Sequence, residues 1–252
     1  MAEIVLQCAQ ISKHFGGLTA LNHVDFEVRA GEVVALLGDN GAGKSTLIKC
    51  ISGVYRPEQG RVTFNGTEIT GHAPSQIRES GIETIYQDLA LAENLDVGAN
   101  VFLGKEKVKR VFGIPVTDDE FMRQEAAKVL ERLDIHIPSL KQKLVNLSGG
   151  QRQAVAIARA IYWNARLVIM DEPTAALGVP EQRKVLALVR SLREQNIPVI
   201  LISHTMQDVL EVADRCVVMR RGRVAANLPH GQFDAEILVR HIVGAGEISG
   251  AA

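Results

Sequence analysis

The N-terminal part of the chain alternates apolar and charged positions. Val24, Phe26 and Val28 are separated by Asp25 and Glu27. A period of two is typical of a strand that buries one face and exposes the other. We therefore expect antiparallel sheet in this part of the chain.

Three later segments are apolar at every position and rich in β-branched residues. Strands that helices cover on both faces bury all of their side chains, so such strands lose the alternation. The segments are Val33–Leu37, Leu167–Met170 and Val199–Ile202. We predict that they form the centre of a parallel sheet.

Between these segments the apolar residues recur with the period of a helix. The positions are Met122, Ala126, Val129, Leu130 and Leu133, and then Val185, Leu188, Val189 and Leu192. Strands that alternate with helices indicate a layered α/β fold. Residues 89–165 have helical periodicity and little strand signal, so we predict an inserted α-helical subdomain there.

The C-terminal part predicts two further strands and a tail. Residues 216–226 look like two short strands that turn at Gly222. Residues 244–252 are rich in glycine and alanine and predict a flexible tail. We therefore expect one domain over residues 1–243.

Composition excludes several classes of protein. The 252 residues carry 28 basic and 29 acidic side chains. The chain therefore lacks the basic excess that is typical of nucleic-acid-binding proteins, and we do not expect nucleic acid as a partner. Three cysteines, Cys8, Cys50 and Cys216, are spaced for neither disulfides nor metal, and buried thiols in a reducing cytosol are the simplest interpretation.

Membrane signals are absent from the sequence. No apolar run approaches the roughly 18 residues that span a bilayer, and the start of the chain does not resemble a signal peptide. The basic run Lys105–Arg110 could contact lipid headgroups, although a solvated loop is the simpler interpretation. We expect a cytosolic chain that would serve a membrane only from its surface.

A phosphate-binding loop follows the first fully apolar segment. Its sequence fits G-x-x-x-x-G-K-[ST] and consists of Gly38, Asp39, Asn40, Gly41, Ala42, Gly43, Lys44, Ser45 and Thr46. Glycines let backbone N–H groups surround an anion, and the following helix adds its dipole. Lys44 is expected to reach the outer phosphates of ATP and Ser45 to bind Mg²⁺.

Two carboxylates follow the second apolar segment. Because neighbouring side chains of a strand point apart, Asp171 and Glu172 are expected to have different roles. We interpret Asp171 as a ligand of Mg²⁺, directly or through water. Glu172 is then the general base that activates or orients the attacking water.

A second glycine-rich helix start lies at Ser148, Gly149, Gly150 and Gln151. Ser148 is a good helix N-cap, and the two glycines expose N–H groups at the positive end of the helix. A plain cap does not need two glycines. The chain therefore has two predicted phosphate-binding sites.

With Leu147 these residues read L-S-G-G-Q, and the chain resembles the ABC ATPases in which this sequence is the signature. The resemblance extends over nearly the whole chain. It implies a P-loop NTPase core with a parallel central sheet, an N-terminal antiparallel β subdomain and an inserted α-helical subdomain. It further implies that Phe15 stacks on adenine, that Gln87 contacts the metal and the attacking water, and that His204 senses the γ-phosphate.

In that family the P-loop of one subunit and the signature of another enclose the same ATP. The resemblance thus implies a homodimer on ATP binding, which works as a two-state element. It also implies integral membrane permease subunits as partners, together with an extracytoplasmic binding protein. Such an ATPase would sit at the cytoplasmic face of the cell membrane.

Finer similarities point to sugar importers. The stretches Gly38–Lys44, Asn100–Gly104 and Ala175–Gly178 resemble those of ribose, xylose and fructose importers, and one copy of each motif resembles the single-domain, fructose-type form. Gly178 departs from the family, which usually has an aspartate there, so we assign it no catalytic role.

Three alternatives to an importer subunit share part of this pattern. A small-molecule kinase would have the P-loop but no use for the signature. A soluble ABC ATPase of translation or repair usually has tandem domains or long coiled coils. A nucleotide-binding regulator without hydrolysis draws its only support from Gly178.

Overall fold

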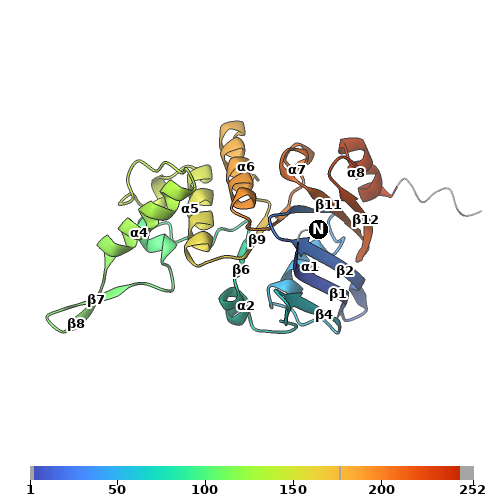
Figure 1. Cartoon of the computed structure of the whole chain (residues 1–252), viewed down its shortest axis with the longest axis horizontal. Coiled ribbons are helices and arrows are strands. Elements are labelled where there is room, and N and C mark those ends of the chain that lie inside the picture. Colours follow the sequence, from blue (N-terminus) through green and yellow to red (C-terminus); the bar gives the residue numbers. More distant parts are fainter. Residues whose placement is uncertain (1–2, 176, 245–252) are drawn as a thin grey trace, which may run out of the picture.

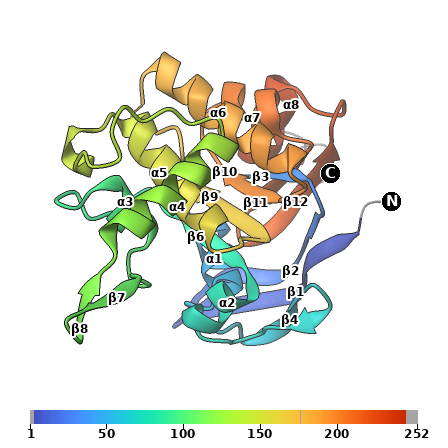
Figure 2. The same ribbon diagram turned by 60° about the vertical axis from the view of Figure 1, so that its left-hand side comes forward.

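The computed structural model describes residues 3–175 and 177–244. Within these ranges the chain forms two sheets with helices packed against them, and a mainly helical part that lies to one side (Figures 1 and 2). The predicted boundaries of the domain (1–243) and of the helical subdomain (89–165) stay predictions. The predicted tail, apart from Gly244, lies outside the described residues.

The N-terminal sheet is antiparallel, with the strand order β2-β1-β4-β5. Its strands are β1 (Ile4–Phe15), β2 (Leu18–Arg29), β4 (Gln59–Phe64) and β5 (Thr67–Glu68). Val24, Phe26 and Val28 of β2 are buried, as their alternation predicts. They belong to a core cluster that also contains Leu47 and Ile51 of helix α1 (Lys44–Ile51).

The second sheet has the order β12-β11-β3-β10-β9-β6. Its strands are β3 (Val33–Leu37), β6 (Ile82–Ile85), β9 (Leu167–Asp171), β10 (Val199–Ile202), β11 (Arg215–Arg220) and β12 (Arg223–Pro229). Only β12 is antiparallel to its neighbour. The three apolar segments occupy adjacent positions as β3, β10 and β9, so their prediction as the centre of a parallel sheet is confirmed, and so is the α/β fold.

Helices cover both faces of this sheet. Ala35 and Leu37 of β3 pack with Val209 of α7 (Met206–Val212) and Leu238 of α8 (Ala235–Val243), whereas Leu36 packs with α1. Helix α6 (Val179–Glu194) lies on the same side as α7 and α8, and α2 (Pro74–Ser80) lies on the other side (Figure 1). Because β3, β9 and β10 are parallel, their carboxyl ends meet at one edge, where α/β proteins bind ligands.

The mainly helical part lies beside the second sheet. It contains α3 (Val97–Val101), α4 (Asp119–Arg132), the 3₁₀ helix η1 (Leu144–Asn146) and α5 (Gly149–Tyr162). Met122, Ala126, Val129 and Leu130 are buried on α4, as the helical period predicts. They belong to one hydrophobic cluster with Phe102. This cluster also contains residues of β9 and α6, so the helical part packs against the second sheet.

A two-stranded hairpin in this region was not predicted. Its strands are β7 (Val108–Val111) and β8 (Ile114–Thr117). The expectation of little strand signal was wrong here, because the two strands contain five β-branched residues. The two-residue turn between them lacks the usual Asn-Gly sequence. The solvated loop expected at Lys105–Arg110 is exposed throughout, but its last three residues belong to β7.

Two smaller predictions are confirmed. Strands β11 and β12 turn at Gly222, which has a φ of 74°. Cys8, Cys50 and Cys216 are free and buried. Burial raises the pKa of Cys50 to about 11 and that of Cys216 to about 12, so both thiols are protonated at neutral pH.

Candidate nucleotide-binding site

The loop of residues 38–43 joins β3 to α1 at the carboxyl edge of the sheet. Gly38 has a φ of 142°, and a Cβ atom there would lie 2.2 Å from the carbonyl oxygen of Met219. Gly43 has a φ of 107°, and its Cβ would lie 2.8 Å from the carbonyl oxygen of Ala20. Glycine is therefore required at both positions, because the loop is held between the β1–β2 hairpin and β11.

Lys44 is the first residue of α1 and is only 7% exposed. Its Nζ atom donates hydrogen bonds to the carbonyl oxygens of Gly38 at 2.5 Å and Asp39 at 3.1 Å. Burial lowers the pKa of Lys44, while Glu172, Asp171 and Asp39 act in the opposite direction. The ammonium group is thus held at the loop in a position to meet a phosphate.

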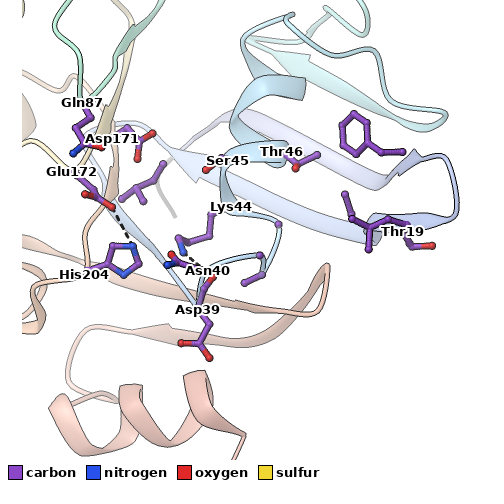
Figure 3. Close-up of a pocket in the computed structure, with 17 residues that line it drawn as sticks. Thr19, Asp39, Asn40, Lys44, Ser45, Thr46, Gln87, Asp171, Glu172 and His204 are labelled. Atoms are coloured by element: carbon purple, nitrogen blue, oxygen red, sulfur yellow. Dashed lines mark hydrogen bonds and ion pairs between the residues drawn. The ribbon is translucent and has the colours of Figure 1, made fainter.

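The loop opens onto a cavity of 360 Å³ (Figure 3). Predicted site residues that line it are Phe15, Asp39, Asn40, Gly41, Ala42, Gly43, Lys44, Ser45, Thr46, Gln87, Asp171, Glu172 and His204. Sequence reasoning missed Leu18, Thr19, Ala20 and Ile202, which line the same cavity. Leu18, Thr19 and Ala20 lie just after Phe15 in the sequence. Their closeness to this predicted site residue is the one sequence feature that could have placed them at the cavity.

The two carboxylates occupy different parts of the cavity. Asp171 ends β9, and Figure 3 shows its carboxylate on the side of Ser45. Burial, together with Glu172, raises the pKa of Asp171, and Lys44 lowers it. Since a nearby cation favours the ionised form, this position suits a carboxylate that meets a metal ion.

Glu172 lies one residue beyond β9 and has left-handed backbone, with a φ of 51°. Its N–H donates to the carbonyl oxygen of Ile202 at 2.8 Å. Its Oε1 atom is 3.1 Å from Nε2 of His204 (Figure 3). Strand alternation thus does not extend to Glu172, so the reason given for its separation from Asp171 was wrong, although the two carboxylates do face different neighbours.

Phe15 ends β1 at the mouth of the cavity and is 40% exposed. The ring of Tyr55 packs edge-on against it, with centroids 5.1 Å apart. Nζ of Lys13 lies 5.4 Å from the centroid of the Phe15 ring. These contacts support the ring while leaving part of it open to a planar group such as a base.

The signature residues do not line this cavity. Ser148 caps α5, since its Oγ accepts from the N–H of Gln151 at 3.3 Å, and Oε1 of Gln151 accepts from the N–H of Ser148 at 3.0 Å. A Cβ at Gly149 would lie 2.5 Å from Cδ2 of Leu177, and one at Gly150 would lie 3.1 Å from Cβ of Glu181. Close packing against the start of α6 is therefore a second reason for the two glycines.

Gly178 is the N-cap of α6, with a φ of −69° that any residue can adopt. A Cβ at this position would lie 3.0 Å from Oε2 of Glu181. The backbone thus does not require glycine here. Ala176, which belongs to the same predicted loop, lies outside the described residues.

A phosphate-binding loop, a paired carboxylate and histidine, and a second glycine-rich helix start together define an ATPase of the ATP-binding cassette class. The ABC transporter family matches residues 21–175, and the chain belongs to this family. Its members of this type are ATPases that bind nucleotide and power transport. The resemblance seen in the sequence is thereby confirmed.

Two similar proteins are sugar import subunits. The xylose/arabinose import ATP-binding protein of Sulfolobus acidocaldarius is 48% identical over 220 residues, which cover 87% of this chain and 86% of that protein. The fructose import ATP-binding protein of Rhizobium meliloti is 44% identical over 225 residues, which cover 88% and 86%.

Solved structures of ATP-binding cassettes have the same fold. A nucleotide-free cassette of an ABC transporter superposes with a TM-score of 0.81 at 28% identity and covers 96% of this chain and 95% of its own. A dimeric cassette with ADP and phosphate bound gives 0.74 at 26% identity and covers 90% of this chain and 100% of its own.

Proposed function

We propose that this chain is the ATP-hydrolysing subunit of an importer for a monosaccharide. The observation that carries the proposal is the 48% and 44% identity to pentose and fructose import proteins over most of both chains. The transported sugar would be bound by a separate permease and an extracytoplasmic binding protein. The chain would lie at the cytoplasmic face of the cell membrane, and no helix within residues 3–175 and 177–244 is long and apolar enough to cross it.

ATP binding would use the cavity in two parts. Phe15 would stack on the adenine ring at the mouth, while Lys44 and the N–H groups of residues 39–46 would hold the phosphates. The exposure of the residues that line the cavity falls from the Phe15 ring at the mouth to the buried Lys44 ammonium. This decrease in exposure would match the order of base, ribose and phosphates in a bound nucleotide.

Mg²⁺ would bind between the phosphates and the side chains of Ser45, Gln87 and Asp171, which line the same cavity. No group of three or more His, Cys, Asp or Glu residues that could hold a metal occurs in the described part of the chain. The set of Ser45, Gln87 and Asp171, with its single carboxylate, fits Mg²⁺. This ion is usually bound by one or two carboxylates together with substrate phosphates. When bound, the ion would neutralise charge that develops on the phosphates.

Hydrolysis would depend on Glu172 as the general base for the attacking water. His204 Nε2, 3.1 Å from Glu172 Oε1, would hold the carboxylate in place and contact the γ-phosphate. Glu172 has a left-handed backbone, and its side chain contacts His204. Strained backbone of this kind is common at active sites.

A complete site would need a second copy of the chain. Ser148, Gly149, Gly150 and Gln151 do not line the cavity of their own subunit. The N–H groups of Ser148 and Gln151 are used in the helix cap, so those of Gly149 and Gly150 would be available to another ATP. A cassette of the same fold is dimeric with ADP and phosphate bound. ATP would thus join two subunits, and its hydrolysis would release them.

The proposal can be tested in vesicles that contain the permease co-purified with this chain. ATP inside the vesicles should drive uptake of at least one of labelled xylose, arabinose, fructose and ribose when the binding protein is present. Lys44→Ala, the matched control, should abolish uptake without loss of permease association. ATP hydrolysis without uptake of any solute would favour a soluble ABC ATPase, and no hydrolysis by the intact complex would favour the regulator that Gly178 suggests.

A further inference from the structure

The β7–β8 hairpin projects from the helical part as an isolated two-stranded ribbon (Figure 1). In both views it extends to the side where α2 and β4 lie, away from α6, α7 and α8 (Figure 2). Every residue from Lys105 to Val116 is exposed. A hairpin of this size contributes little to the core, so its sequence is free to serve another purpose.

Three of the four side chains on one face of the hairpin are apolar. Cross-strand partners share a face, and the pairs Val111–Ile114 and Lys109–Val116 lie on the same side. The apolar members of this face and the turn, which we name the hairpin patch, are Val111 (42% exposed), Phe112 (101%), Ile114 (64%) and Val116 (38%). Apolar side chains gathered at the end of a projecting hairpin indicate a contact surface.

The turn residue Phe112 gives the strongest indication that the hairpin has a function beyond folding. Phe112 and Gly113 have φ values of 50° and 83°, as a type I′ turn requires. Asparagine or aspartate adopts the first position easily, whereas a bulky residue there is strained. The chain therefore keeps a fully exposed aromatic ring at a position where folding alone would favour another residue.

Basic side chains surround the hairpin patch. Residues 105–117 contain four basic residues and one acidic residue, a net charge of +3. Lys109 pairs with Asp118 at 2.9 Å, and Nζ of Lys105 lies 4.3 Å from the centroid of the Trp163 ring at the base of the hairpin. Of the residues that the structure describes, none forms an ion pair with Arg110, which precedes Val111 and lies with Pro115 on the opposite face of the ribbon.

We propose that the hairpin patch inserts into the interface of an anionic lipid bilayer. Aromatic and aliphatic side chains bordered by Lys and Arg are the combination that binds at the headgroup region of acidic membranes. Four-residue strands extend about 13 Å, enough to carry Phe112 through a headgroup layer of roughly 5–8 Å. The proposal relies on the proposed function only to bring the chain close to a membrane.

A second copy of the chain fits this surface less well. Pro115 lacks an N–H group, and together with Lys109 and Arg110 it makes the short edges of the ribbon unfavourable for strand addition. The patch also lies on a projecting ribbon and is exposed from the turn to the base (Figure 1). A fluid lipid interface can adapt to such a shape without a matching groove.

The test is flotation of the full-length protein with vesicles of phosphatidylcholine that contain about 30% phosphatidylglycerol. Phe112→Asn, which suits the turn, should lower the partition coefficient roughly 10-fold or more, because it removes the largest apolar side chain. Arg110→Gln should lower it about 5-fold. Binding by the parent should weaken in 0.5 M salt and on purely phosphatidylcholine vesicles.

Val239→Asn provides the matched control, since Val239 is 47% exposed on α8, on the opposite side of the molecule. This variant should float like the parent, and Phe112→Asn should hydrolyse ATP in solution at the parental rate. Equal flotation of Phe112→Asn and the parent, or no flotation of the parent, would overturn the proposal. Unchanged flotation of Phe112→Asn with loss of permease association would identify a protein-docking surface instead. Failure of sugar uptake with intact flotation would overturn only the proposed function.

Discussion

Glu172 shows how a single residue depends on its neighbour in the sheet. Its N–H is held by the carbonyl oxygen of Ile202, the last residue of β10, and its carboxylate by His204, two residues beyond that strand. A sequence motif can predict that a carboxylate follows the strand. It cannot predict the left-handed backbone, because that conformation follows from contacts with a strand 30 residues away.

Asp171 is expected to lower the stability of the protein without nucleotide. Its pKa is raised by burial and by Glu172, so the folded state holds the proton more tightly than the unfolded state. The unfavourable ionised form is fully present above the raised pKa and disappears as the pH falls below the unfolded value of about 3.9. Asp171→Asn should therefore raise the free energy of unfolding at neutral pH.

Urea unfolding from pH 7 to acidic pH would measure this effect. The gain from Asp171→Asn should shrink as the pH falls, and the variant should lose Mg²⁺-dependent ATP hydrolysis. Ser45→Ala provides a control that also affects the metal but adds no pH-dependent gain. A variant less stable than the parent at pH 7 would contradict the account.

A buried hydrogen bond links the segment after Glu172 to helix α7, which begins just after His204. Oγ1 of Thr174 donates to Oδ2 of Asp208 at 2.5 Å, and Asp208 is only 5% exposed in the first turn of α7. Thr174→Val keeps the shape but leaves the carboxylate without its donor. The expected loss is about 1–3 kcal/mol of stability, with slower hydrolysis.

Thr174→Ser keeps the hydroxyl and should behave nearly like the parent in both thermal unfolding and ATP turnover. The comparison of the two variants separates the hydrogen bond from side-chain volume. If Thr174→Val and Thr174→Ser changed stability and turnover equally, the Thr174–Asp208 hydrogen bond would make no measurable contribution.

The elements differ in how far the sequence predicts them. The segments β3, β9 and β10 were predictable because complete burial leaves apolar runs, and α4 and α6 because burial on one face leaves a period of 3.6 residues. The β7–β8 hairpin was not, because all residues of its strands are exposed and its turn contains Phe112 in place of asparagine. The same reasoning found the P-loop but missed Thr19 and Ile202, which have no chemistry that marks them in a sequence.

In the proposed dimer, two subunits share each ATP. Ser148→Arg should leave ATP binding to the monomer unchanged, since Ser148 lies outside the cavity of its own chain. The larger cationic side chain should block the partner's phosphate and abolish hydrolysis. Ser148→Ala loses the helix cap, worth about 1 kcal/mol, but leaves the space open, and so separates the two effects. Rapid hydrolysis by Ser148→Arg alone would argue against a shared site.

We expect Glu172 to drive the hydrolysis that separates an ATP-bound dimer. Glu172→Gln keeps the size of the side chain but removes the proton acceptor, so turnover should slow by roughly 10²- to 10⁴-fold. In light scattering with Mg²⁺ and ATP, this variant should accumulate as a dimer, whereas Glu172→Gln combined with Lys44→Ala should remain monomeric. Parental turnover by Glu172→Gln, with no ATP-dependent dimer, would contradict the account.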